Sequence, residues 1–256
     1  MQNFPAPGCS DTPLPDSLLS PSVNPYLRAV TRLGLVMKRP LLRRRVSKPI
    51  IEHVLGRSFL VLPQVLNPVV FRSGRLLAEF VATSSLMREF RPHPGAEPGT
   101  ATVLDMGTGS GICAVFAAAA GFRVIGVDVN HSAVRCARIN ALLNALDDRI
   151  EIREGDLFAP LRNERFDIVL FNPPFFRGFP TPGFDQAWRG TDVIERFASG
   201  VSAVLTDRGR AFVLVSTDGD RPNTDEVLSR SGFALQVLCR KHYGNEIMTI
   251  YDVTRG

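Results

Sequence analysis

A short polar segment, Asn172-Pro173-Pro174-Phe175, directly follows Phe166–Phe171, an apolar run that predicts a buried strand. The Asn172 side-chain oxygen and the Pro173 backbone carbonyl can each accept one N–H of an NH2 group. Two such acceptors would hold a conjugated nitrogen, whose lone pair is delocalised, in line for attack on a methyl group. The prolines fix the backbone, and Phe175 offers a flat apolar face. The segment therefore indicates methyl transfer to nitrogen, although Pro-Pro after a strand is also an ordinary entry to a loop.

A glycine-rich turn lies upstream, between the predicted strand Ala101–Met106 and a helical apolar pattern that starts at Ile112. The turn reads Gly107-Thr108-Gly109-Ser110-Gly111. Glycines let a ligand approach the backbone closely, and the start of a helix presents free N–H groups to an anionic group. A dinucleotide fingerprint would need its third glycine at position 112, so Ile112 disfavours NAD. The alternative is a purely structural turn into a helix.

Acidic residues follow the next two predicted strands. Asp128 ends the run that starts at Phe122, and a carboxylate at the end of a second strand can accept both hydroxyls of a ribose. Ile150–Arg153 is followed by Gly155-Asp156-Leu157, where Asp156 can accept from an adenine amine while Leu157 packs on the ring. Asp after Gly is also common in turns. Together these segments indicate a cofactor that contains a nucleoside.

In this order and spacing, four segments resemble the class I S-adenosylmethionine-dependent methyltransferases: Asp105–Gly111, Asp128, Gly155-Asp156 and Asn172–Phe175. Within that superfamily the chain is similar to the HemK/PrmC-type enzymes, which methylate a glutamine amide of peptide-chain release factors. Further segments resemble the archaeal and eukaryotic branch of these enzymes: Val61–Pro63, Phe71–Phe80, Phe184–Phe197 and Gly244–Glu246. The similarity covers roughly residues 57 to 256.

The resemblance implies S-adenosylmethionine as the cofactor and assigns roles to individual residues. The cofactor-binding residues would be Asp105, Gly107, Thr108, Gly109, Asp128, Asp156, Leu157 and Asn172. The catalytic residues would be Asn172, Pro173 and Phe175. Glutamine methyltransferases usually have Tyr at the position of Phe175, and a Phe occurs there in enzymes that methylate exocyclic amines of RNA bases.

The resemblance to the HemK/PrmC-type enzymes implies that the acceptor is a protein glutamine of the release-factor type. An RNA adenine or guanine amine and a small molecule remain alternatives. A non-catalytic partner subunit is disfavoured because Asn172 and Asp128 are intact. Some members of the branch work with a small activating subunit, so such a partner also remains open.

From residue 101 onward the pattern alternates strands and helices, which predicts a parallel α/β sheet covered on both faces. The expected strands centre on 102–106, 123–128, 149–154, 166–171 and 209–216, with helices near 76–90, 111–120, 131–144, 191–205 and 222–231. The last two runs, Phe233–Arg240 and Glu246–Val253, predict an antiparallel hairpin. The resemblance implies a Rossmann-like, seven-stranded sheet. The first and fourth core strands would flank the reversal of strand order, where the glycine turn and Asn172 meet.

Residues 1–56 predict a flexible, basic N-terminal extension, and residues 57–256 the methyltransferase domain. The densest positive charge lies in Arg39–Lys48, and the net charge is +5. This run could contact RNA phosphates or be a solvated helix end. The long connection from Pro173 to Trp188 is rich in aromatic residues, and we expect it to form a loop that closes over the substrate. The alternative is that its aromatic side chains cover part of the edge of the core.

Composition predicts a soluble, cytoplasmic enzyme. With 45% hydrophobic and 21% charged residues, the chain is unlike disordered proteins. No run approaches the ~20 apolar residues of a membrane span, and the amino terminus lacks an export signal. The four cysteines and four histidines lack metal-ligand spacing, so no metal is expected.

Overall fold

The computed structural model describes residues 47–91, 101–174, 176–177, 189–219, 221–243 and 246–256. Most of the predicted extension, Phe175, and nearly all of the loop expected to close over the substrate therefore lie outside the described residues. Within those ranges no helix combines the length and the apolar character needed to cross a membrane.

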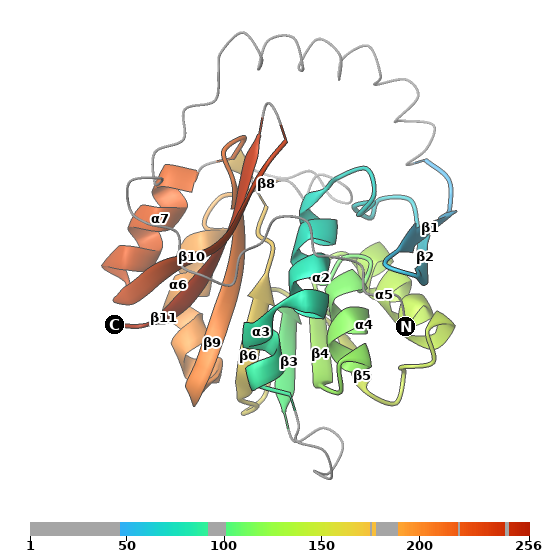
Figure 1. Cartoon of the computed structure of the whole chain (residues 1–256), viewed down its shortest axis with the longest axis horizontal. Helices are drawn as coiled ribbons and strands as arrows, with labels where there is room; N and C mark the ends of the chain where they lie inside the picture. Colours follow the sequence, from blue (N-terminus) through green and yellow to red (C-terminus); the bar gives the residue numbers. More distant parts are fainter. Residues whose placement is uncertain (1–46, 92–100, 175, 178–188, 220, 244–245) are drawn as a thin grey trace, which may run out of the picture.

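A seven-stranded sheet forms the centre of the molecule (Figure 1). Its strands lie in the order β10 (Phe233–His242), β11 (Ile247–Arg255), β9 (Leu205–Ser216), β6 (Phe166–Phe171), β3 (Thr102–Met106), β4 (Arg123–Asp128) and β5 (Ile150–Glu154). The five strands from β9 to β5 are parallel, whereas β11 runs antiparallel to both β9 and β10. The predicted α/β fold with a C-terminal antiparallel hairpin is confirmed. Strand β9 begins at Leu205, earlier than expected, because Leu205 already pairs with Phe166 before a register shift.

Helices cover both faces of this sheet. One face carries α2 (Ser73–Thr83), α3 (Ser85–Glu89), α4 (Ile112–Ala119) and α5 (His131–Leu143), and the other carries α6 (Val193–Val204) and α7 (Arg221–Arg230) (Figure 1). The two faces have separate hydrophobic clusters, since side chains alternate along each strand. In β6, for example, Ile168 and Leu170 belong to one cluster, and Val169 and Phe171 belong to the other.

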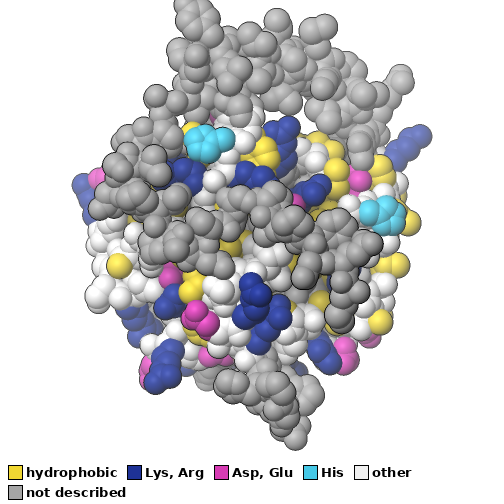
Figure 2. All heavy atoms as spheres, in the orientation of Figure 1, with side chains coloured by type: hydrophobic (Ala, Val, Ile, Leu, Met, Phe, Trp, Pro, Cys, Tyr) yellow, Lys and Arg dark blue, Asp and Glu magenta, His cyan; other side chains and the backbone are white. Residues whose placement is uncertain are grey.

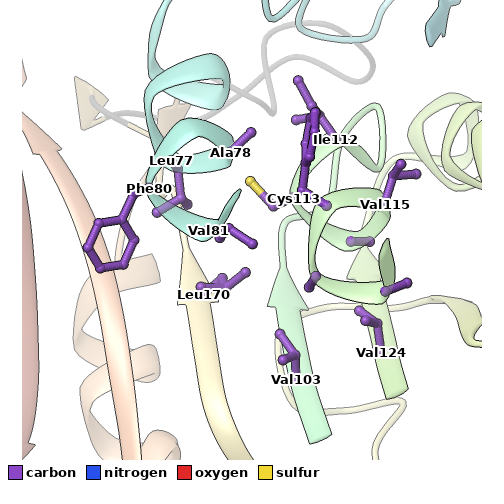
Figure 3. Packing of buried hydrophobic residues seen from close by; sticks show 14 of the residues in the cluster. Leu77, Ala78, Phe80, Val81, Val103, Ile112, Cys113, Val115, Val124 and Leu170 are labelled. Carbon is purple, nitrogen blue, oxygen red and sulfur yellow. The ribbon is translucent and has the colours of Figure 1, made fainter. Parts of the chain in front are cut away.

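Helix α4 is almost entirely buried, and its many alanines leave room for a second helix to pack closely against it. That helix is α2, whose Leu77, Ala78 and Val81 belong to the same buried cluster as Ile112 and Cys113 of α4 (Figure 3). As a result α2, which precedes the first core strand in sequence, is fixed beside the glycine turn that starts α4.

The expected helix over residues 76–90 is wrong in one respect, because it is divided in two. Ser84 has an extended backbone (φ −64°, ψ 140°), and its side chain accepts a hydrogen bond from the Leu86 N–H at 3.1 Å. A serine that caps the following helix in this way competes with continuation of the preceding one.

An antiparallel hairpin, which the sequence pattern did not predict, precedes α2. Its strands are β1 (Ile50–Val54) and β2 (Arg57–Val61). The hairpin therefore spans the boundary between residues 56 and 57 that the sequence pattern predicted between the extension and the domain. Leu55 and Gly56 connect the strands with positive φ angles of 47° and 79°. A short parallel pair, β7 (Phe176–Arg177) and β8 (Arg189–Gly190), lies beyond β6 in sequence.

Candidate active site

A cavity of about 290 Å³ lies at the carboxyl ends of the parallel strands. It lies where the strand order reverses, because β4 and β6 flank β3. Eight of the predicted site residues line it: Asp105, Gly107, Thr108, Gly109, Asp128, Asp156, Leu157 and Asn172. The structure thus brings together residues that are up to 67 positions apart in the sequence.

The glycine turn connects β3 to α4 through three left-handed positions. Gly107, Gly109 and Gly111 have φ angles of 67°, 56° and 76°, which residues with a Cβ rarely adopt. The Thr108 N–H donates to the Val127 carbonyl at 2.9 Å and ties the turn to β4. The turn therefore presents backbone atoms at the start of α4 to the cavity.

The buried Asp105 side chain is hydrogen-bonded to the turn and to the start of α4. Its Oδ2 accepts from Thr108 Oγ1 at 2.7 Å and from the Ala114 N–H at 3.1 Å. Burial raises the pKa of Asp105 to about 7, while these two hydrogen bonds act in the opposite direction. Because these two bonds engage Oδ2, we expect the main role of Asp105 to be stabilising the conformation of the turn.

Asp128 joins the end of β4 to both neighbouring loops. Its Oδ2 accepts from the Gly109 N–H at 2.9 Å, and its Oδ1 accepts from the Asn130 N–H at 2.9 Å. Burial raises the pKa of Asp128, and the backbone hydrogen bonds oppose that shift. Each carboxylate oxygen has more than one lone pair, so both can still accept from a ligand hydroxyl.

Asp156 forms an ion pair with Arg196, a contact that the sequence pattern did not predict. Arg196, in the first turns of α6, donates through Nη1 to Asp156 Oδ2 at 2.5 Å and through Nε to Asp192 Oδ1 at 3.1 Å. All three side chains line the cavity and are about half exposed. Asp156 is therefore held at the cavity wall by a bridge from α6.

Asn172 is the first residue after β6 and is half-buried. Its Nδ2 donates to Ser73 Oγ of α2 at 3.2 Å. Its Oδ1 is buried and accepts no hydrogen bond from the described residues. A buried acceptor without a donor costs free energy, which a ligand N–H can recover on binding.

The remaining predicted catalytic residues are less well placed by the structure. Pro173 is buried and does not line the cavity, although its neighbour Pro174 does. Phe175 lies outside the described residues. Across the ranges that the structure covers, no three His, Cys, Asp or Glu side chains come together as a metal site.

Sequence reasoning missed several residues that build the cavity. Ser73 and Arg196 reach it from helices, where local pattern carries no sign of a distant partner. Asn130 also lines it: its side chain caps α5 through the Ser132 N–H at 2.9 Å and donates to the Gln64 carbonyl at 2.9 Å. Only Asn130 had a readable signal, because an Asn before a helical pattern is a favoured cap.

Comparison with known proteins agrees with this geometry. Residues 70–241 match the methyltransferase small domain family. The chain belongs to this family. Its described domain is thus an S-adenosylmethionine-dependent methyltransferase domain.

Several relatives are similar to this chain. It is 30% identical to a ribosomal protein uL3 glutamine methyltransferase of Bradyrhizobium diazoefficiens over 70% of this chain and 60% of the relative. It is 31% identical to a putative protein N5-glutamine methyltransferase of Methanocaldococcus jannaschii over 60% of this chain and 81% of the relative. Other curated relatives are release factor glutamine methyltransferases and RNA methyltransferases, and the chain spans about half the length of several of them.

A solved structure shares the fold. The 16S rRNA N2 G1207 methyltransferase of T. thermophilus, in complex with AdoMet and guanosine, aligns with a TM-score of 0.57 at 24% identity over 82% of this chain and 50% of that one. The cavity of the family member described here suits the cofactor. The glycine turn has no Cβ atoms at Gly107 and Gly109, and Asp128 places a carboxylate at the end of β4.

Proposed function

We propose that this protein transfers a methyl group from S-adenosylmethionine to a nitrogen, and that the acceptor is a glutamine side-chain amide of a protein of the release-factor type. The observation that carries the proposal is the buried Asn172 Oδ1, which accepts no hydrogen bond from the described residues. An N–H donor of the acceptor is the group that such an oxygen needs.

Asn172 and Pro173 act by orientation in this proposal. Asn172 lines the cavity, and its oxygen accepts one N–H of the acceptor. Pro173 does not line the cavity, so its carbonyl has to turn toward the acceptor on binding to accept the other N–H. Together the two bonds hold the nitrogen in line with the methyl group. When bound beside these residues, S-adenosylmethionine would supply an electrophilic methyl group: the nitrogen lone pair would form the new N–C bond, and the C–S bond would break with its electron pair left on sulfur. The methylated nitrogen then releases a proton to water, and no side chain has to act as a strong base.

The cofactor-binding side of the proposal rests on the strand ends. Gly107, Thr108 and Gly109 would lie against the methionine part, Asp128 would accept from the ribose, and Asp156 with Leu157 would contact the adenine. In support, Asp128 is the last residue of β4, Asp156 follows the neighbouring strand β5, and both line the cavity. Substituting Asp128 with Ala should weaken cofactor binding at least tenfold, because both the ribose contact and the bond to Gly109 are lost.

A protein acceptor is favoured over RNA by the glutamine methyltransferases among the relatives. RNA methyltransferases also occur among them, and the net charge of +5 suits phosphates. Where described residues are visible in Figure 2, however, the Lys and Arg side chains are spread among other residue types. An RNA amine is therefore the second candidate.

The deciding assay incubates the protein with radiolabelled S-adenosylmethionine and cell extract that is then separated into protein and RNA fractions. Label on a protein of release-factor size supports the proposal, and label on RNA replaces it with the second candidate. Label on neither points to a small acceptor or to a required activating subunit, which purified partner proteins can test.

The role of Asn172 has its own test. Asn172→Ala should lower kcat by about 100-fold or more, as loss of a transition-state hydrogen-bond group does, with cofactor Kd nearly unchanged. Asn144→Ala is a suitable control because Asn144 is also half-buried but lies outside the cavity. Turnover of Asn172→Ala close to that of the control would exclude the proposed role.

We also propose that residues 57–256 carry the catalytic activity and that the basic extension before them contributes to acceptor binding in the cytoplasm. A chain that lacks residues 1–46 should keep cofactor affinity. If the extension contacts RNA phosphates, its removal should flatten the salt dependence of acceptor binding. An unchanged dependence would remove RNA contact from its roles.

A further inference from the structure

Ser73 and Asn172 come from different layers of the molecule and meet at the cavity. Ser73 is the first residue of α2, Asn172 follows β6, and both line the cavity. Ser73 is 5% exposed, and its Oγ lies 3.2 Å from Asn172 Nδ2. Arg72, the residue before Ser73, forms no side-chain cap hydrogen bond at the start of α2.

We propose that Ser73 is a positioning residue, which holds the Asn172 amide in place at the cavity so that its oxygen can meet an acceptor that donates N–H. This inference rests on the proposed transfer to nitrogen and deepens it. Ser73 acts through Asn172 and does not itself touch the reacting atoms.

The orientation matters because the two ends of an amide have opposite hydrogen-bonding character. Oδ1 accepts, whereas Nδ2 carries two donors, and half a turn about the last side-chain bond exchanges them. In the structure the Ser73 hydroxyl accepts from Nδ2, and Oδ1 remains available to an acceptor N–H. Because a hydroxyl can also donate to Oδ1, the N–H of the bound acceptor selects this orientation, and the bond to Ser73 holds the amide in it. In the reversed orientation the amide NH2 would meet the N–H of the acceptor, and two donors facing each other do not form a hydrogen bond.

The start of α2 is fixed on two sides, so Ser73 has a defined place. On one side, Cys113 Sγ of α4 lies 3.9 Å from the Gly74 carbonyl and donates to it. On the other side, the Arg72 guanidinium lies 4.8 Å from the centre of the Tyr243 ring, beyond the end of β10. The position of the Ser73 hydroxyl is therefore set by packing that does not depend on Asn172.

The test compares four variants of the full chain. Ser73→Ala removes the hydroxyl, and alanine is a good helix former that keeps α2. Ser73→Thr retains a hydroxyl, while Ser73→Val has nearly the shape of Thr without it. Ser84→Ala is the control, because Ser84 is an equally buried serine that caps α3 away from the cavity.

Two measurements are made on each variant. The first is the ¹⁵N–¹H NMR signal of the Asn172 side-chain amide with S-adenosylhomocysteine bound, assigned by its absence in Asn172→Ala. The second is the rate of methyl transfer to the extract fraction that the wild-type protein labels. The NMR signal needs no acceptor, so it still tests the Ser73–Asn172 contact if no fraction is labelled and the proposed function fails.

Ser73→Ala and Ser73→Val should shift or broaden the Asn172 amide signal and lower kcat about tenfold, with cofactor Kd within about twofold of wild type. Ser73→Thr should restore both the signal and kcat relative to Ser73→Val, and Ser84→Ala should change neither. An unchanged amide signal in Ser73→Ala overturns the proposal. So does a loss of kcat that is equal in Ser73→Thr and Ser73→Val, or that Ser84→Ala reproduces.

Discussion

Asn140 provides a strong test of how the pocket is held together. Its side chain is fully buried in α5 and joins the N-terminal hairpin to the glycine turn. Oδ1 accepts from the Leu60 N–H at 2.7 Å, and Nδ2 donates to the carbonyls of Leu60 and Ser110, each at 2.8 Å. Asn140→Ala removes these three bonds, together with a longer one from Nδ2 to Cys136 Sγ at 3.7 Å, and leaves backbone groups of β2 and the turn without these partners.

Each buried hydrogen bond contributes roughly 1 kcal/mol, so we expect Asn140→Ala to lower the free energy of unfolding by about 3 kcal/mol. That is a large fraction of the stability of an ordinary domain. With a urea m-value of about 2 kcal/mol/M, the midpoint of unfolding followed by circular dichroism should fall by roughly 1.5 M. Because Ser110 belongs to the glycine turn, the cofactor Kd should rise as well.

Asn144→Ala is the matched control one helical turn later. Asn144 is half-buried; its Nδ2 donates to the Ser58 and Asn140 carbonyls at 3.0 and 2.9 Å, and its Oδ1 accepts from Arg57 Nη1 at 3.4 Å. Because Asn144 is less buried than Asn140, we expect water to replace much of what the substitution removes. The substitution should cost about 1 kcal/mol and leave the cofactor Kd unchanged. A midpoint for Asn140→Ala no lower than that of Asn144→Ala would refute the reasoning.

Three further variants test other parts of the site. Gly111→Ala should destabilise the fold by about 2 kcal/mol in thermal unfolding, because Gly111 has φ 76° and a Cβ there would lie 3.0 Å from Ala137 of α5; a stability equal to wild type would contradict this. Burial raises the pKa of Asp105 to about 7 from 3.8, so the folded state retains a proton that the unfolded chain has lost between about pH 4 and 7. Relative to Asp105→Asn, the wild-type protein should therefore lose stability as pH rises through that window, and parallel pH profiles would show that Asp105 does not titrate there. Arg196→Ala should change stability by less than about 1 kcal/mol, because its ion pairs are about half exposed, and the loss should shrink in high salt.

The sheet and the cavity wall made by strand ends could be predicted because their signals are local. The strands β4 and β6 are short, mainly apolar runs, and a residue proposed for the site lies at the end of each: Asp128 is the last residue of β4, and Asn172 directly follows Phe171 of β6. Since the carboxyl ends of parallel strands lie at one edge, the order of strands was enough to bring Asp105, Asp128 and Asn172 together.

The parts that were missed depend on distant partners. The β1–β2 hairpin is joined to α5 by Asn140, about 80 positions away, and no local pattern of the hairpin predicts that contact. Ser84 divides the expected helix because its side chain caps the next one, a choice that helix periodicity alone does not reveal. Arg196 likewise pairs with Asp156 across 40 positions.

The residues proposed to bind the cofactor were predicted from local sequence patterns, whereas a residue proposed to act on the acceptor side was not. The residues proposed for the cofactor lie on the glycine turn and near the ends of β3, β4 and β5, which the sequence pattern predicted. Ser73, the residue proposed to hold the Asn172 amide in place, comes from α2, which precedes the core strands in sequence and packs on α4. The family match begins at residue 70, just before this helix, and the relatives act on proteins in some cases and on RNA in others. In this proposal α2 and the segments after β6 shape the acceptor side, and the strand ends hold the cofactor. Ser73→Ala should therefore lower kcat for the acceptor and leave cofactor affinity nearly unchanged. Asp128→Ala should weaken cofactor binding and have a smaller effect on kcat at saturating cofactor.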